Sequence, residues 1–333
     1  MLKIVSWNVN GLRTRIIDNK ESKDFKTKTI IEGDSHLGNL VNDFNPDIIC
    51  FQETRCGQLN TDKFEIQDYH RFYNSSELTG ARSGDRYSGV AIWSKIKPNL
   101  VVTELPTLSS PNKEGRILIL YYDHFILINT YQPNTGTNFD YRITEWDPAM
   151  AEFLEILNTE TNLPIIWTGD LNIARTHQDI FVGDIRYQFR NNTEKIDTEE
   201  KLKEKETKYL ETDIMKGIGE NAMVGFTREE RENFREILDL GFTDVWRHLN
   251  PNTKFDGYTW WNMRYKPYRK LNRGWRIDYF VINNQYLDLA TECKVFKHIG
   301  EPNNNDDNGK VGSDHAPIGL TIKLPNQTNT SKI

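Results

Sequence analysis

The 333-residue sequence has few cysteines, no long apolar run and no internal repeat. Cys50, Cys56 and Cys293 lack metal-ligand spacing and cannot all pair, which favours a reducing intracellular compartment. No apolar run approaches the roughly 20 residues that a membrane helix needs, so we expect no membrane association. A predicted strand, LKIVSWN, follows Met1 directly, so we expect no signal peptide. These absences predict a soluble protein of the nucleus or cytoplasm that is not secreted.

The net charge is −6, which taken alone weakly disfavours a polyanionic partner. One segment has the opposite character, because residues 264–276 contain six Lys or Arg residues and no Asp or Glu. Tyr and Trp residues are interleaved with these cations from position 258 onward, and we name 258–276 the basic aromatic segment. Cations beside flat rings suit a phosphate backbone with an unstacked base or sugar. A solvated loop whose rings pack into the core is an equally weighted alternative.

Short apolar segments rich in β-branched residues recur along the chain, and each ends near Gly, Pro, Asn or Asp, as strands do. They cover 2–8, 47–53, 87–94, 116–122, 125–131, 164–170, 276–283 and 316–322. A short connection joins 116–122 to 125–131, which predicts a hairpin and therefore antiparallel pairing.

Helical patterns lie between these strands. We predict a helix over 147–158 with Asp147 as its N-cap, because its apolar residues recur at helical spacing. A second helix is predicted over 227–241, where Thr227 and Glu230 have the spacing of a capping box. Many short strands, some antiparallel, with helices among them predict an α/β sandwich.

Two polar stretches, 16–39 and 185–222, look like additions to the body of the fold. The second is rich in Lys and Glu, and Glu204 and Lys208 have the spacing of an ion pair on a solvated helix. We favour exposed insertions without chemistry. An arm that contacts DNA or a protein partner is the alternative.

Polar residues cluster where the predicted strands end. The clusters are Asn8 with Asn10, Gln52 with Glu53, Tyr131 with Asn134, Asp170 with Asn172, and Asp314 with His315. Carboxylate and amide oxygens gathered at one sheet edge are the ligands that Mg²⁺ prefers. A carboxylate can also deprotonate water while a neighbouring histidine binds phosphate. Each cluster alone is more often a cap or turn, but five clusters at strand ends indicate a phosphate-processing site.

The ordered motifs WNVNGLR, FQET, YSGVAIWS, TYQPN, WTGDLNIA, GFTREER, GWRIDYF and GSDHAP resemble the exonuclease III family of abasic-site endonucleases. The resemblance runs from Lys3 to about Leu324. It implies a DNase I-like, four-layered α/β sandwich: two mixed, largely antiparallel sheets packed face to face, with helices outside. It also implies a single catalytic domain over 1–324, with insertions near 16–39 and 185–222 and a polar tail over 325–333.

The resemblance assigns catalytic roles residue by residue. Asp170 matches the carboxylate that activates the attacking water, and Asn172 helps to orient that water and hold the phosphate. His315 matches the histidine that contacts the scissile phosphate, and Asp278 matches the acid that orients its ring. Tyr131 matches a phosphate contact and completes the implied catalytic set.

The same resemblance implies a magnesium site, with Mn²⁺ as an alternative ion. Its ligands would be Asn10, Glu53, Asp170, Asn172, Asp314 and His315, with Glu53 as the principal one. Together with the basic aromatic segment, it implies DNA contacts from Asn8, Arg13, Tyr87, Asn134, Trp260, Arg264, Arg269, Lys270 and Trp275. Trp260 and Trp275 fall where the family lines a pocket for a flipped-out abasic sugar.

The implied function is Mg²⁺-dependent cleavage of duplex DNA 5′ to abasic sites, with 3′-phosphodiesterase and 3′→5′ exonuclease activity, by a monomer without an obligate protein partner. A phosphoinositide 5-phosphatase on the same fold is one alternative. That class should have an aromatic residue and Arg after Asn172, whereas Ile173 and Ala174 follow here. A non-catalytic DNA-binding protein is the other alternative. It predicts loss of Glu53, Asp170, Asp278 or His315, all of which are present.

Overall fold

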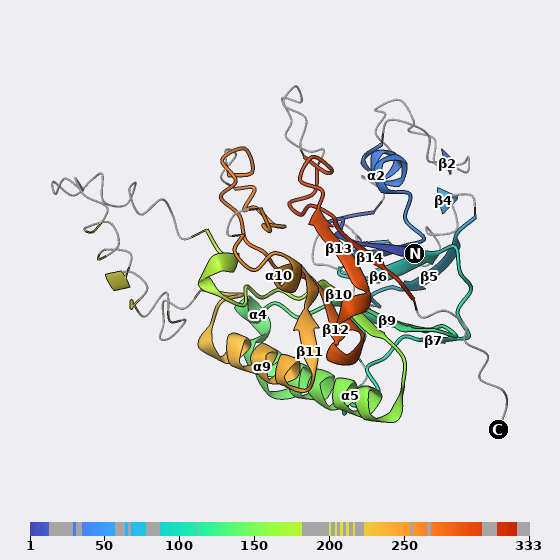
Figure 1. Ribbon diagram of the computed structural model, residues 1–333, viewed down its shortest axis with the longest axis horizontal. Helices are drawn as coiled ribbons and strands as arrows, with labels where there is room; N and C mark the ends of the chain where they lie inside the picture. The colour runs from blue at the N-terminus through green and yellow to red at the C-terminus, as the bar shows by residue number, and fades with distance from the viewer. Residues whose placement is uncertain are drawn as a thin grey trace.

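The computed structural model is built on two six-stranded sheets (Figure 1). It describes residues 1–12, 29–30, 35–56, 64–65, 68–77, 87–110, 112–181, single positions between 200 and 216, 223–253, 256–264, 268–301 and 312–324. The first sheet has the order β13 (Ala290–Val295), β14 (Ile318–Ile322), β1 (Leu2–Asn8), β3 (Ile48–Gln52), β6 (Val90–Ser94), β5 (His70–Asn74). The second has the order β11 (Phe242–Asp244), β12 (Asp278–Asn283), β10 (Ile165–Asp170), β9 (Ile126–Tyr131), β8 (Ile117–Tyr121), β7 (Leu100–Val102). A separate pair joins β2 (Thr29–Ile30) to β4 (Phe64–Glu65).

Both sheets are mixed and mostly antiparallel. The parallel pairs are β1 with β3 in the first sheet and β9 with β10 in the second. The hairpin predicted from the short connection after β8 is confirmed, because β8 and β9 pair antiparallel. Side chains alternate between the faces of a strand, so each of these buried strands contributes to two apolar layers.

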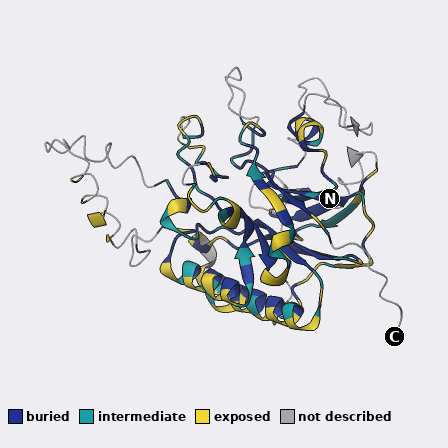
Figure 2. Ribbon diagram, viewed as in Figure 1, coloured by how far each residue is buried: buried dark blue, intermediate teal, exposed yellow. Residues whose placement is uncertain are grey.

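Helical segments lie between the strands of the described chain. They are α2 (His36–Phe44), α4 (Thr135–Asp140), the π-helix η1 (Tyr141–Trp146), α5 (Asp147–Glu160), η2 (His177–Asp179), α9 (Arg228–Asp239), α10 (Val245–Leu249) and η3 (Asn284–Leu289). The helices α5 and α9 turn their buried faces toward the second sheet (Figure 2). The helix α2 packs on the first sheet through residues such as Leu37 and Leu40.

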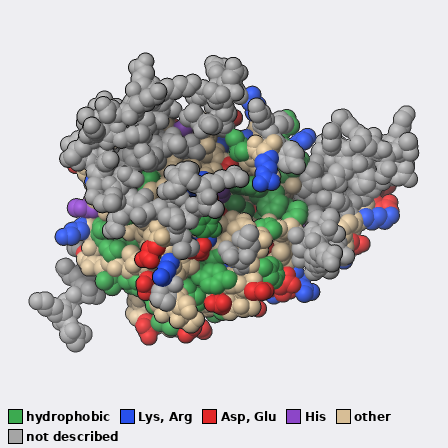
Figure 3. All heavy atoms as spheres, turned by 180° about the vertical axis from the view of Figure 1, so that it is seen from behind, with side chains coloured by type: hydrophobic (Ala, Val, Ile, Leu, Met, Phe, Trp, Pro, Cys, Tyr) green, Lys and Arg blue, Asp and Glu red, His purple; other side chains and the backbone are tan. Residues whose placement is uncertain are grey.

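The largest core cluster lies between the sheets. It joins first-sheet residues such as Ile4 and Ile92 to second-sheet residues such as Leu120 and Phe280. Apolar burial between the sheets and beneath the helices stabilises the fold at roughly 25 cal/mol per Å² of apolar area removed from water. The predicted four-layered sandwich is confirmed. Figure 3 shows Asp and Glu side chains along the lower margin of the molecule seen from behind, in keeping with the negative net charge.

Local predictions are partly confirmed. The capping box of Thr227 and Glu230 is present at the start of α9. The prediction that Asp147 caps α5 is wrong, because η1 already runs into this helix and Asp147 accepts a 2.6 Å hydrogen bond from Arg142 instead. The exposed pair of Glu204 and Lys208 is present at 3.0 Å.

The end of the stretch 16–39 belongs to α2, where Ser35 is the N-cap and Leu37 is buried. Arg13, the tail 325–333 and most of both polar stretches lie outside the described residues. All three cysteines are buried. Among the described residues, no helix combines the length and the hydrophobicity that crossing a membrane requires.

Candidate active site

Strand pairing brings three polar residues to the same level of the second sheet. Asp170 ends β10, where it lies opposite Tyr131 of β9 and opposite Asp278 of β12. Gly169 makes this close packing possible, because a Cβ there would lie 1.9 Å from the carbonyl oxygen of Thr130. Position 169 therefore has to be glycine, and the candidate carboxylate of Asp170 follows it.

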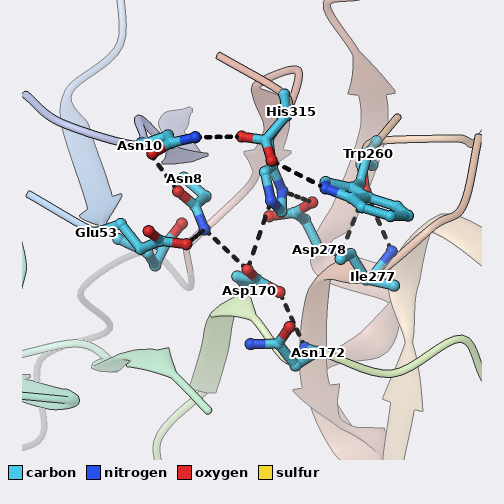
Figure 4. Close-up of polar contacts among 12 residues, drawn as sticks. Asn8, Asn10, Glu53, Asp170, Asn172, Trp260, Ile277, Asp278 and His315 are labelled. Carbon is cyan, nitrogen blue, oxygen red and sulfur yellow. Dashed lines mark hydrogen bonds and ion pairs between the residues drawn. The ribbon is translucent and has the colours of Figure 1, made fainter. Parts of the chain in front are cut away.

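His315 lies over the two aspartates and contacts both (Figure 4). Its Nδ1 is 2.9 Å from Asp278 Oδ2, and its Nε2 is 3.7 Å from Asp170 Oδ2. All three side chains are at least 96% buried. The structure thus brings together the water-activating carboxylate, the histidine and its orienting acid that the motifs predicted in separate segments.

This close packing shifts the pKa values of Asp170 and His315. Burial raises the pKa of Asp170 from 3.8 to about 7, although the attraction of His315 opposes this shift. Burial alone would lower the pKa of His315, but the charges of Asp278 and Asp170 outweigh it and raise the pKa from 6.5 to about 10. At neutral pH the site therefore holds a cationic imidazolium beside a carboxylate poised to exchange a proton.

Asn8 links this cluster to Glu53. Its Nδ2 donates to Glu53 Oε1 at 3.0 Å and to Asp170 Oδ2 at 2.8 Å. The other oxygen of Glu53 accepts from the guanidinium of Arg55. Glu53 has a φ of 49°, a left-handed conformation that aims its side chain away from the line of β3. The predicted principal metal ligand thus faces the Asp170 side of the site.

Asp314 is a further acidic residue of the site, and Asn10 and Trp260 both bind it. Asn10 Nδ2 donates to Asp314 Oδ1 at 2.8 Å, and Trp260 Nε1 donates to Asp314 Oδ2 at 3.1 Å. Burial opposes ionisation of Asp314, but the charge of His315 and these donors lower its pKa below the usual 3.8. Asp314 is therefore an anion at neutral pH.

The chemistry of these side chains fits a hard divalent cation. Ligand atoms of Asp170, Asp278 and His315 lie within 4.8 Å of one another. Asp278 Oδ1 is buried and has no hydrogen-bond partner among the described residues. Anionic oxygens beside amide groups are the donors that Mg²⁺ takes. Asp278 was predicted only to orient His315, so its membership of this group is an addition made by the structure.

Tyr131 and Tyr87 share one buried arginine that the motifs did not single out. Arg116 donates to the Tyr131 carbonyl oxygen at 3.1 Å and to the Tyr87 hydroxyl at 2.9 Å, and it lies over both rings. Burial raises the pKa of Tyr131 well above 10, so its hydroxyl stays protonated at neutral pH. The only sequence signal for Arg116 was a charge at the start of an apolar strand.

Asn134 and Asn172 extend the site beyond Asp170. The backbone N–H of Asn172 donates to Asp170 Oδ1 at 2.9 Å, in a left-handed turn with φ 50° at Asn172. Asn134 Nδ2 donates to Asn172 Oδ1 at 3.4 Å, and Asn134 is exposed. The two amides lie together at the surface, where an incoming phosphate could reach them.

Trp260 and Trp275 form one wall beside His315. Their rings meet edge to face at 5.9 Å and 77°, and both are half-buried. The backbone of Trp260 also forms single antiparallel β-bridges with Trp275 and with His315. The tryptophans predicted to line a sugar pocket are therefore adjacent to the cluster of Asp170, Asp278 and His315.

The basic aromatic segment contains two kinds of cation. Arg264 and Lys270 are exposed. Arg269 is 9% exposed, and its guanidinium donates to five backbone carbonyls; these belong to Lys297, Ile299, Gly300, Ser313 and His315. The structure lends no support to the predicted phosphate contact of Arg269, because its donors hold the loop that carries His315.

Arg276, the last cation of the basic aromatic segment, is also buried. It is 1% exposed and pairs with Asp179 at 2.8 Å and with Asp244 at 2.6 Å. Arg247 joins the same network through Asp179. A run of cations in the sequence is thus divided by the fold into surface charges and buried structural charges.

The chain belongs to the Endonuclease/Exonuclease/phosphatase family, whose profile matches residues 5–315. It is 32% identical over 328 residues to the DNA-(apurinic or apyrimidinic site) endonuclease of Dictyostelium discoideum, covering 97% of this chain and 71% of that one. It is 31% identical to the DNA repair nuclease APEX1 of Danio rerio, covering 97% and 83%. The resemblance predicted from the motifs is confirmed.

Other relatives agree in function class and in fold. The exodeoxyribonuclease of Bacillus subtilis (strain 168) is 28% identical, with 97% of this chain and 100% of that one covered. Among solved structures, an AP endonuclease from Archaeoglobus fulgidus superposes with a TM-score of 0.63 at 21% identity, covering 97% and 100%. The 3'-5' exonuclease NExo from Neisseria meningitidis gives 0.68 at 22%, also covering 97% and 100%. At these identities the solved structures show the fold.

Proposed function

We propose that the protein is a Mg²⁺-dependent DNA-repair phosphodiesterase that cleaves duplex DNA 5′ to abasic sites and also removes 3′ blocks or nucleotides. Relatives named as abasic-site endonucleases and exodeoxyribonucleases support this class of activity. The observation that carries the proposal is the contact of His315 with both Asp170, at the end of β10, and Asp278, at the start of β12. This arrangement offers a base and a phosphate-binding cation side by side.

In this mechanism Asp170 takes a proton from the attacking water. Its pKa of about 7 suits an acid–base group that works near neutral pH. His315 binds the scissile phosphate as a cation, and Asp278 holds the ring through Nδ1 so that Nε2 faces the substrate. Asn172 and Asn134 bind phosphate oxygens with their amides.

Mg²⁺ would be held by Glu53 and Asp170, with Asn10, Asn172, Asp314 and His315 close by. When bound, the ion supplies positive charge that stabilises the pentacoordinate phosphorus. Mn²⁺ offers similar coordination chemistry. We expect Asn8 to keep Glu53 and Asp170 at a fixed separation, because its one amide nitrogen donates to both.

The substrate is proposed to be an abasic site in duplex DNA. The edge-to-face pair of Trp260 and Trp275 gives a rigid apolar wall that a sugar without its base could contact. A missing base also lowers the cost of unstacking the nucleotide. The exposed Arg264 and Lys270 would contact the backbone, and so would the exposed Tyr87, whose hydroxyl accepts a hydrogen bond from the buried Arg116. A monomer suffices for all these contacts.

The decisive assay incubates purified protein and Mg²⁺ with a duplex carrying one abasic analogue and with an intact duplex. A nick at the analogue identifies the endonuclease, and a ladder from the 3′ end identifies the exonuclease. We expect Asp170→Asn to slow the nick by on the order of 10² to 10⁴. The matched control is Asp288→Asn, an exposed residue of η3.

Three results would contradict the proposal. The wild-type protein could leave both duplexes intact, Asp170→Asn could cleave at the wild-type rate, or cleavage could continue in full after EDTA treatment. The first outcome rejects the substrate class, the second the role of Asp170, and the third the need for a metal.

A further inference from the structure

Thr259 lies between the two segments that carry Asp278 and His315. It is fully buried, with 0% of its surface exposed. Its backbone N–H donates to the carbonyl oxygen of Trp275 at 2.8 Å, and its own carbonyl accepts from Ala316 N at 2.7 Å. Thr259 therefore joins the approach to Asp278 to the residue that follows His315.

The side chain of Thr259 makes a second connection. Its Oγ1 accepts hydrogen bonds from the backbone N–H of Ile277 at 3.1 Å and of Asp278 at 3.2 Å. A hydroxyl oxygen has two lone pairs, so both acceptor positions are used. Figure 4 shows Ile277 and Asp278 beside Trp260, the neighbour of Thr259. The hydroxyl is thus bonded to the backbone that carries the histidine's partner.

Strand pairing does not satisfy the backbone N–H groups of Ile277 and Asp278. The edge strand β11 pairs with β12 only at Val281, Ile282 and Asn283, so none of the described strands flanks the start of β12 on that side. Without an acceptor, two buried N–H groups would be left unpaired, which proteins avoid. The Thr259 hydroxyl takes the place of the missing strand.

We propose that Thr259 is a positioning residue for the Asp278–His315 pair. Among the described residues, the Oδ2 of Asp278 has His315 as its hydrogen-bond partner, and the Oδ1 has none. The direction of this carboxylate therefore depends on where its backbone lies, and the Thr259 hydroxyl fixes that backbone. Loss of the hydroxyl displaces Asp278 and tilts the ring of His315.

The test compares Thr259→Val, which keeps the shape and loses the hydroxyl, with Thr259→Ser, which keeps the hydroxyl. The kinetic arm rests on the proposed function. We expect Thr259→Val to lower kcat by about 10- to 100-fold with KM nearly unchanged, because small displacements of catalytic groups have effects of that size. Thr259→Ser should restore kcat.

A spectroscopic arm uses the DNA-free protein. The His315 Nδ1 proton, shared with Asp278, should give a downfield ¹H NMR signal that shifts or broadens in Thr259→Val and is retained in Thr259→Ser. This signal requires no substrate. A protein that cleaves no DNA would reject the proposed function, and the signal would still decide the role of Thr259.

Thr168→Val is the matched control. Thr168 is also fully buried, and its hydroxyl donates to the β12 backbone at the carbonyl of Tyr279 rather than accepting from Asp278. We expect it to lower Tm and leave kcat near the wild-type value. An equal loss of kcat in Thr168→Val, or wild-type kcat and an unchanged signal in Thr259→Val, would overturn the proposal. If Thr259→Val does not fold, Thr259→Cys replaces it, since a thiol is a weak acceptor.

Discussion

Asp170 and Asp278 are direct cross-strand partners in the antiparallel pair of β10 and β12. Two carboxylates in such a position repel each other when both are ionised. His315 lies over them and contacts both, so its positive charge makes the arrangement tolerable. The pKa values of His315 and Asp170 both depend on this arrangement.

The alkaline limit of activity should depend on Asp278. The pKa of His315 is raised to about 10, and Asp278 is the main charge that raises it. The wild-type enzyme should therefore keep its cationic ring, and its kcat/KM, well above neutral pH. We expect Asp278→Asn to move the alkaline fall of kcat/KM toward neutral pH. Wild-type and variant profiles with the same alkaline limb would contradict this, and Asp288→Asn serves as the control.

Ionised Asp170 should destabilise the metal-free fold. Its pKa is raised from 3.8 to about 7, so the folded state binds this proton more tightly than the unfolded chain does. The resulting cost is absent below about pH 4, grows between pH 4 and 7, and is constant above pH 7. We expect Asp170→Asn to have a higher Tm than the wild type at pH 8 in EDTA, and a similar Tm at pH 4. Calorimetry showing a lower Tm for the variant at pH 8 would refute this expectation.

The buried network around Arg276 should contribute strongly to stability. Arg276→Met leaves Asp179 and Asp244 buried without their principal cation. Removing one partner of a buried ion pair costs about 3–5 kcal/mol of unfolding free energy. The control is Arg228→Met, whose pair with Glu229 is exposed and should contribute about 0–1 kcal/mol. Equal urea midpoints for the two variants would show that the network is dispensable.

The two cations Lys270 and Arg269 should differ in their effect on DNA binding. Lys270 is exposed, so Lys270→Gln should reduce the slope of log affinity against log salt by about 1. Arg269 is engaged by backbone carbonyls, so Arg269→Gln should lower Tm and leave that slope unchanged. Fluorescence anisotropy across a salt series measures both. A reduced slope for Arg269→Gln alone would reverse the assignment.

Short-range patterns in the sequence were sufficient to predict much of the fold and to name the candidate site residues. The apolar segment 164–170 had to be a buried strand, and its polar end had to lie at a sheet edge. The capping box of Thr227 and Glu230 was equally predictable, because its two residues are three positions apart. These features depend on neighbours along the chain, which the sequence displays directly.

The motifs and their order also determined the family, but they could not show which charges are buried. Arg276 pairs with Asp179, which lies 97 positions away, and Arg269 bonds carbonyls of 297–315. In the sequence both residues look like any other cation of a basic run.

What only the tertiary structure decided is how the site is held. Asp170 meets Asp278 through strand pairing, and His315 reaches both. From buried positions, Thr259 bonds the backbone of Asp278, and Arg116 bonds the carbonyl of Tyr131. Such contacts join segments far apart in the chain, and a hydrogen bond requires its two partners within about 3.5 Å of each other. That distance exists only after the sheets have packed, so the sequence names the chemical groups and the fold sets their geometry.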